Sequence, residues 1–448
     1  MSDATAPSLG ECTVCRAKSA WAQGFVQVSG FIRGPRTVCV TCWQYDRSYR
    51  QFYVRWAFWA ALVVLAAYFQ TGSFVPAVEL AIALYVVAYL AVVVHELGHA
   101  LTAVALGFRV SALSLGGGVR TKILAVRNTF VLLGPSPVEG LVLLQPRSTR
   151  HYRKKMALIL VAGSAVNLLC AVLAINAEGL IEAAPARAVV ALWTAVNLIF
   201  VLNLVPVVSG GAFGPLRSDG LQLLDLFKLG DEAIAKQVRQ APLTEAYVAF
   251  QYGDLNRAHA AIAPALSSGD LDATGRILAA GITIGMGKAE EGIELSRRYL
   301  DANDHTDAER AMLMNNLACG LLDSSVGAVA PARLAEADEL TARAMDVLPM
   351  TNAVRATRAC VLIEQGAYRD AHRLLSDKRF RLEPPWIRAG IKAALALALA
   401  GQGQTDSADT VLREATRLHP DSAAAKQARE RMALMLRARE TEVASANT

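Results

Sequence analysis

The chain has 448 residues, which is too long for one ordinary hydrophobic core and predicts two or three folded units. Apolar residues make up 54% of it, and they concentrate between about residues 54 and 229, whereas the first fifty and the last two hundred residues resemble soluble protein in composition. The formal net charge of +6 is modest, and much of the basic excess lies beside the apolar segments. This placement argues against a nucleic-acid partner and for charges that orient membrane helices.

Residues 1–50 are expected to form a small zinc-ribbon-like module. Two Cys-x-x-Cys pairs, Cys12/Cys15 and Cys39/Cys42, flank a β-prone stretch at residues 25–28. Four thiolates can hold one structural Zn²⁺ and so fold a segment with almost no apolar core, provided that this end faces the reducing cytosol. A pair of disulfides, or thiols without metal, is the alternative. No cleavable signal peptide is expected before the first apolar segment.

Residues 51–230 predict a polytopic α-helical membrane domain with about four transmembrane helices, at 54–69, 78–106, 156–177 and 189–208. Each is near the roughly 20 residues that cross the hydrocarbon layer, the first being somewhat short. Backbone groups at that depth must be satisfied internally, which requires helices. The loop between the second and third segments is rich in Arg and Lys and has one acidic residue, Glu139. The positive-inside rule therefore predicts that the N-terminus, this loop and the C-terminal region are cytoplasmic.

The basic loop itself carries strand-like patterns at 109–115, 123–133 and 138–144. A strand at the membrane face could pair with an extended substrate. From residue 231 to 440 the sequence changes to alanine-rich amphipathic helices with recurring turns at Gly253, Gly366 and Gly403. This pattern resembles tetratricopeptide repeats, in which stacked helix pairs bind a protein partner, here a cytosolic one. The polar residues 441–448 are expected to be a disordered tail.

The strongest chemical signal is His95-Glu96-Leu97-Gly98-His99, inside the second apolar segment. Two histidines four residues apart lie on one face of a helix and can bind one zinc ion, and Glu96 can act as general base. Ionisable groups in a membrane segment cost several kcal/mol unless they find partners, so a functional role is the default interpretation. An interfacial polar patch without metal is the alternative.

A catalytic zinc needs a third protein ligand, and Asp219 in Ser218-Asp219-Gly220 is the candidate. It follows Asn203-Leu204-Val205-Pro206, and these motifs together resemble the site-2 protease family of intramembrane zinc metalloproteases. The resemblance covers about residues 77–229. It implies zinc ligation by His95, His99 and Asp219, with Glu96 as the base. The stretch 207–218 is longer and richer in glycine than in that family, so Asp225 is kept as the fallback ligand.

The third apolar segment contains Gly163-Ser164-Ala165-Val166-Asn167. Its small residues would allow a neighbouring helix to approach closely. Asn167 could then take a catalytic role by donating a hydrogen bond to the substrate backbone or to the oxyanion, or it could only join helices. Asn203 has the same ambiguity and could also brace the break before Pro206.

These features predict regulated intramembrane proteolysis, the hydrolysis of a membrane-anchored protein in or near a transmembrane segment. Resemblance to bacterial members implies a multi-pass protein of the bacterial plasma membrane, acting within the lipid bilayer on transcription regulators or anti-sigma factors. Two zinc ions are expected, one catalytic and one structural. The alternative is a catalytically silent membrane scaffold that recruits cytosolic partners through the zinc-ribbon and repeat domains. A zinc transporter would need more than one intramembrane ligand cluster.

Overall fold

The computed structural model describes residues 25–30, 34–39, 61, 65, 69, 74–117, 121–126, 129–135, 137, 139–211, 214–269, 271–302, 304–323, 329–349 and 351–446. The chain divides into two compact units. One is Gln44–Glu245, and the other combines Met1–Trp43 with Ala246–Thr448. The division falls inside one helix, α7 (Asp231–Gln251). The domain limits at residues 50 and 230 stay a prediction.

Near the N-terminus, β1 (Phe25–Gly30) and β2 (Gly34–Cys39) form an antiparallel hairpin in which Phe25 lies opposite Cys39. Cys39 therefore ends a strand, while Cys12, Cys15 and Cys42 lie outside the described residues. The zinc-ribbon module stays a prediction. Most of the first predicted transmembrane segment, 54–69, also lies outside the described residues.

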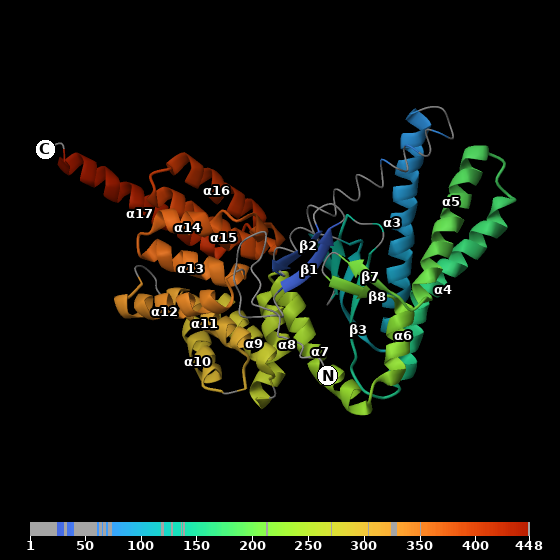
Figure 1. Cartoon of the computed structure of the whole chain (residues 1–448), viewed down its shortest axis with the longest axis horizontal. Helices are drawn as coiled ribbons and strands as arrows, with labels where there is room; N and C mark the ends of the chain where they lie inside the picture. The colour runs from blue at the N-terminus through green and yellow to red at the C-terminus, as the bar shows by residue number, and fades with distance from the viewer. Residues whose placement is uncertain are drawn as a thin grey trace. The chain divides into compact units, whose positions relative to one another are not determined.

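Three helices of the described residues are long and apolar enough to cross a membrane, at Val78–Ala105, Tyr152–Glu178 and Ala186–Leu204. They correspond to α3 (Phe74–Ala105), α4 (Tyr152–Glu178) and α5 (Ala184–Val201), drawn in blue and green in Figure 1. All three contact one another. The chain continues from α5 into the short 3-10 helix η3 (Leu202–Leu204), which ends just before Pro206, a residue that cannot donate to a helix. Three of the four predicted transmembrane segments are therefore helices with the length and the apolar composition of a membrane span.

A mixed four-stranded sheet lies between α3 and α4 in the sequence, with strand order β4-β5-β3-β6. Its strands are β3 (Arg109–Leu115), β4 (Thr121–Val126), β5 (Thr129–Leu133) and β6 (Leu141–Gln145). β3 runs parallel to β5 and antiparallel to β6. The segment 123–133, whose pattern suggested a single strand, is divided into β4 and β5, which pair with each other. β6 is an edge strand of this sheet.

The glycine-rich stretch before Asp219 forms a second antiparallel hairpin, β7 (Val208–Gly211) and β8 (Gly214–Arg217). It leads directly into α6 (Asp219–Lys228), which packs on α4 and η3. The extra length between Pro206 and Asp219 is therefore used to build a hairpin, and the start of α6 returns to the end of α5.

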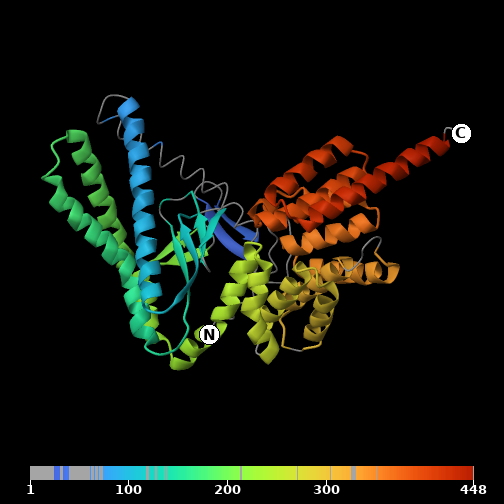
Figure 2. The same cartoon turned by 180° about the vertical axis from the view of Figure 1, so that it is seen from behind.

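The helices of the other unit are paired and run from yellow-green to red in Figure 2. After α7 the helices are α8 (Leu255–Ser268), α9 (Ala273–Gly285), α10 (Ala289–Leu300), α11 (Asp307–Asp323), α12 (Pro331–Val347), α13 (Asn352–Glu364), α14 (Tyr368–Leu375), α15 (Pro385–Gly401), α16 (Thr405–Leu418) and α17 (Ala423–Ala446). From α8 onward each helix contacts the next, and α9, α11, α13, α15 and α17 also contact one another in order. Alternate helices thus form a continuous inner row, as in a helical-repeat solenoid.

The turns of these repeats follow from their sequences. Gly366 and Gly403 end α13 and α15 with φ of +75° and +81°, a conformation that side chains disfavour, and each reverses the chain into the next helix. At the C-terminus, α17 continues to Ala446, where a disordered tail from residue 441 was expected. Residues 423–446 contain no Gly or Pro and are rich in Ala, Arg and Glu, all good helix formers.

Candidate metal centre

The predicted ligands come from two helices. His95 and His99 lie one turn apart on α3 and are 3% and 7% exposed, and Asp219 is the first residue of α6 and 8% exposed. Ser218 caps α6 by accepting from the Leu221 amide, and its hydroxyl donates to the Val205 carbonyl at 2.7 Å. The cap therefore ties the start of α6, and with it Asp219, to the segment that follows η3.

The three ligand atoms form a nearly equilateral triangle. Asp219 Oδ2 lies 3.2 Å from His95 Nε2 and 3.1 Å from His99 Nε2, and the two nitrogens are 3.1 Å apart. Ligand atoms held tetrahedrally at about 2.0–2.1 Å from zinc would lie about 3.3–3.4 Å apart. Within the described part of the chain this is the one group of three such side chains with metal-binding geometry. The spacing fits a zinc ion that leaves a fourth position open.

The opposite edges of the two imidazole rings determine which nitrogen can bind metal. His99 Nδ1 lies 2.6 Å from the Ile159 carbonyl, which can only accept, so this nitrogen donates. His95 Nδ1 donates to Asn167 Oδ1 at 2.7 Å. In the neutral rings both Nε2 lone pairs then point toward the Asp219 carboxylate. Converging lone pairs in a buried site repel one another without a cation, and donation from the far nitrogen is the usual arrangement for zinc-binding histidines.

Asp219 is ionised in this setting. Burial raises the pKa of its carboxyl, but the two imidazole rings within 3.2 Å lower that pKa to about 2. Asn203 adds a further donor, because its Nδ2 lies 2.6 Å from Asp219 Oδ2. The same Nδ2 lies 3.2 Å from His95 Nε2, so Asn203 is at the centre rather than behind it.

Asn167 lies behind His95 in a buried chain of amides. Its Nδ2 donates to Asn197 Oδ1 at 2.7 Å and to the Ala91 carbonyl at 3.2 Å, while Asn197 Nδ2 donates to the Trp193 carbonyl. Both asparagines are completely buried. Asn197 was not identified from the sequence, although an Asn inside an apolar membrane segment was an available signal.

Two glycines let the functional side chains fit. A Cβ on Gly163 of α4 would lie 2.4 Å from His99 Nε2 and 2.9 Å from His95 Cε1, so only glycine lets both rings rest on this helix. A Cβ on Gly140, immediately before β6, would lie 2.3 Å from Glu96 Oε1. Glu96 is 7% exposed, so its carboxylate is enclosed between α3 and the start of an edge strand.

Asp225, the fallback ligand, lies elsewhere on α6. Its two carboxylate oxygens are each 3.2 Å from a cation, one from Arg217 Nη1 and the other from Lys228 Nζ. These ion pairs hold it on the polar face of α6, apart from the group formed by His95, His99 and Asp219.

Comparison with known proteins covers the part of this site that lies on α3 and α4. Residues 82–184, which contain α4 and most of α3, match Peptidase family M50. No curated protein matches the chain.

Similar solved structures cover the helical-repeat region. A thermophilic TPR protein of Thermus thermophilus, TTC0263, is 19% identical over 44% of this chain and 98% of its own, with a TM-score of 0.34. YrrB, a TPR protein with an unusual peptide-binding site, is 17% identical over 42% of this chain and 91% of its own, with a TM-score of 0.26. At such TM-scores, the description of this region as helical repeats rests on its own helix pairing.

Proposed function

Starting from residues 82–184 as a peptidase family M50 segment, we propose that this chain is an intramembrane zinc endopeptidase. The observation that carries the proposal is the buried triangle of His95, His99 and Asp219 with Glu96 enclosed beside it. A scaffold would gain nothing from placing these groups together, because their burial costs several kcal/mol without a ligand.

The proposed chemistry divides among the side chains. His95, His99 and Asp219 would hold zinc, which supplies a Lewis acid that polarises a carbonyl and makes water acidic near neutral pH. Glu96 takes the proton from the attacking water and returns it to the leaving amine. Asn167 orients His95, since its amide hydrogens are already used by Asn197 and the Ala91 carbonyl. Asn203, at the centre itself, is the better placed amide for the oxyanion.

The substrate would be a membrane-anchored protein cut in or near its transmembrane segment. Helices hide their peptide bonds, so the cleaved stretch must be extended first. β6 offers an edge strand for an extended peptide, and the residue before it, Gly140, touches Glu96. A peptide paired with β6 would therefore pass close to the general base. We further propose that the N-terminus, the sheet and the repeat unit are cytoplasmic.

The test compares Glu96→Gln with the wild type on tagged single-span substrates. Glutamine keeps the size of the side chain but not its basicity, so cleavage should fall by roughly 10²–10⁴-fold while zinc content stays unchanged. Glu178→Gln, at the far end of α4, is the matched control and should cleave normally. Full processing by Glu96→Gln in cells would exclude the protease and favour the scaffold.

Zinc content tests the metal assignments separately. The purified protein should contain two zinc ions, the second at Cys12, Cys15, Cys39 and Cys42. Replacing His95 and His99 with Ala should remove one equivalent and leave the other. Unchanged zinc in this double variant would exclude the catalytic site, and one equivalent in the wild type would exclude the structural one.

A further inference from the structure

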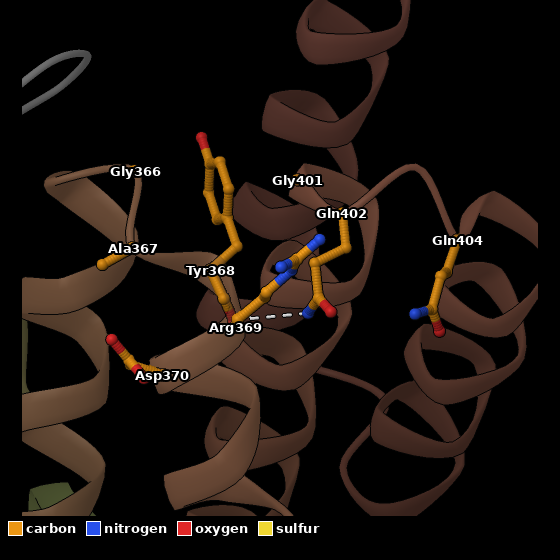
Figure 3. Close-up of a pocket in the computed structure, with 8 residues that line it drawn as sticks. All are labelled: Gly366, Ala367, Tyr368, Arg369, Asp370, Gly401, Gln402 and Gln404. Carbon is orange, nitrogen blue, oxygen red and sulfur yellow. Dashed lines mark hydrogen bonds between the residues drawn. The ribbon is translucent and has the colours of Figure 1, made fainter.

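Two pockets of similar size open on the helical-repeat unit, and their charges differ. The first, of about 530 Å³, lies between the α13–α14 turn and the α15–α16 turn, and its charged residues are Arg369 and Asp370 (Figure 3). The second, of about 630 Å³, lies between the end of α14, the 3-10 helix η4 (Lys378–Leu382), α15 and α16. Its charged residues are the basic Lys378, Arg381, Arg388, Lys392 and Arg417 and the acidic Asp377 and Glu414. We call this second one the basic pocket.

The acidic residues of the basic pocket are already paired. Asp377 accepts from Arg379 and lies 3.1 Å from Arg355, two arginines outside the pocket lining. Glu414 lies 2.7 Å from Lys392. By contrast, no acidic side chain among the described residues is ion-paired with Lys378, Arg388 or Arg417. These three cations give the pocket a positive charge that its own carboxylates do not cancel.

The walls combine this charge with an apolar floor. Arg388, Ile391, Lys392 and Leu395 follow the three- and four-residue spacing of one face of α15. Ile391 and Leu395 are buried, as are Leu375 and Phe380 on the neighbouring segments, so the charged groups form a rim above apolar side chains. Such a surface complements a carboxylate next to an apolar group.

We propose that the basic pocket binds a short acidic segment of a partner protein, with one apolar side chain seated on its floor. A membrane surface of anionic lipid fits less well, because its headgroups offer no apolar side chain for the floor below the charged rim. A pocket also admits one side chain at a time, whereas a bilayer presents a broad face. Helical-repeat surfaces commonly bind extended peptides. The proposal does not depend on the protease activity.

The test uses the full-length protein in detergent and a fluorescent peptide of Glu and Asp around one Leu. The matched peptide has Gln and Asn instead. The acidic peptide should bind more tightly at low salt than at high salt. The double variant Arg388→Glu, Arg417→Glu should weaken binding by about tenfold or more. Arg369→Glu, in the other pocket, should change the Kd by less than about twofold.

Lys378→Glu serves as the control for folding. Because Lys378 is exposed, this change should leave Tm unchanged and should still weaken binding of the acidic peptide. Equal binding of the two peptides would overturn the proposal, as would an unchanged Kd in the double variant. Phosphatidylglycerol vesicles provide the second arm. If vesicle binding, and not peptide binding, is lost with Arg388→Glu, the pocket recognises lipid headgroups and the proposal is wrong.

Discussion

The apolar helices α4 and α15 are both rich in alanine and leucine, yet only α4 buries polar side chains while it leaves leucines exposed. In α4, Leu169 and Leu173 are exposed, whereas Ser164 and Asn167 are buried. In α15, Leu397 and Leu399 are buried, and the charged Arg388 and Lys392 border a pocket that opens on the surface. α4 thus buries its polar groups and exposes part of its apolar surface, whereas the buried side chains of α15 are all apolar.

The difference shows which solvent each helix is built for. Lipid tails are as apolar as leucine, so an outward leucine costs nothing in a bilayer, and a polar group needs partners inside the protein. In water, by contrast, an exposed leucine is unfavourable and an exposed polar group is satisfied by the solvent. Helix length already distinguishes a membrane helix from a water-soluble one here, since the 27 residues of α4 extend about 40 Å and the 17 residues of α15 about 26 Å. Only the first can cross the roughly 30 Å hydrocarbon layer with ease.

The largest effect is expected for zinc retention, at the point where α4 packs against the two histidines of α3. In Gly163→Ala the new methyl group would overlap both imidazole rings, so either α3 and α4 separate or the histidines leave the triangle. Zinc retention against a chelator should fall by more than the roughly 100-fold that a lost hydrogen-bond partner behind a ligand costs. Gly179→Ala, where a Cβ meets nothing within 4 Å, is the control. Normal zinc content in Gly163→Ala would refute the geometry of the site.

The next effect concerns stability, because replacing a leucine with alanine should have different consequences in the two helices. Leu397 of α15 is 7% exposed, and Leu397→Ala should destabilise the repeat unit by about 2–5 kcal/mol through loss of packing. Leu169 of α4 is 55% exposed, and Leu169→Ala should leave the stability of its unit nearly unchanged in detergent. Limited proteolysis at increasing urea concentration reports each unit separately. A large loss for Leu169→Ala would mean that this face packs against protein rather than lipid.

A smaller effect should come from the amide chain behind His95. Asn197→Leu removes the acceptor for Asn167 Nδ2, which frees Asn167 to rotate and weakens its hold on His95. Zinc affinity should fall by about tenfold, the lower end for partners of metal-binding histidines. Asn176→Leu is matched, because Asn176 also donates to the carbonyl four residues earlier but lies far from the centre and is exposed. Equal zinc affinities in the two variants would assign Asn197 to helix packing only.

These residues also show what the sequence could predict. His95, Glu96 and His99 lie within five residues, so helix geometry alone predicts that the histidines share a face. Asp219 is 124 residues from His95, and only the resemblance to a known family connected them before the structure brought them together. The turns at Gly253, Gly366 and Gly403 were found because they are local and recur.

Features that depend on distant contacts were harder to predict. The contacts of Gly163 and Gly140 with the site are properties of crossing elements, and glycine in a sequence does not reveal what touches it. Asn197 acts through Asn167, thirty residues earlier on another helix. The division of residues 121–133 into β4 and β5 is visible only in the strand pairing, in which β5 pairs with β3 and β4 pairs with β5.

The smallest expected effect concerns charge in the repeat unit and its dependence on pH. Asp377 and Glu383 lie six residues apart, and the pKa values of their carboxyls shift in opposite directions. Burial would raise the pKa of Asp377, but hydrogen bonds from Arg379 lower it overall. For Glu383 burial dominates and raises the pKa, although Asn352 donates to its carboxylate at 2.8 Å. The two groups should therefore respond to acid with opposite signs.

For Asp377 the folded pKa lies below the unfolded value of about 3.9, so its stabilisation is present above that pH and disappears as the pH falls through the folded pKa. Asp377→Asn should then lower stability at pH 7 by about 1 kcal/mol, since it removes the carboxylate that pairs with two buried arginines, and by less at pH 3. For Glu383 the folded pKa is raised, so ionisation opposes folding at neutral pH. Glu383→Gln should be neutral or stabilising at pH 7 and without effect at pH 3. Urea unfolding of the repeat unit at both pH values measures the two differences, and parallel pH profiles for both variants would contradict the opposed shifts.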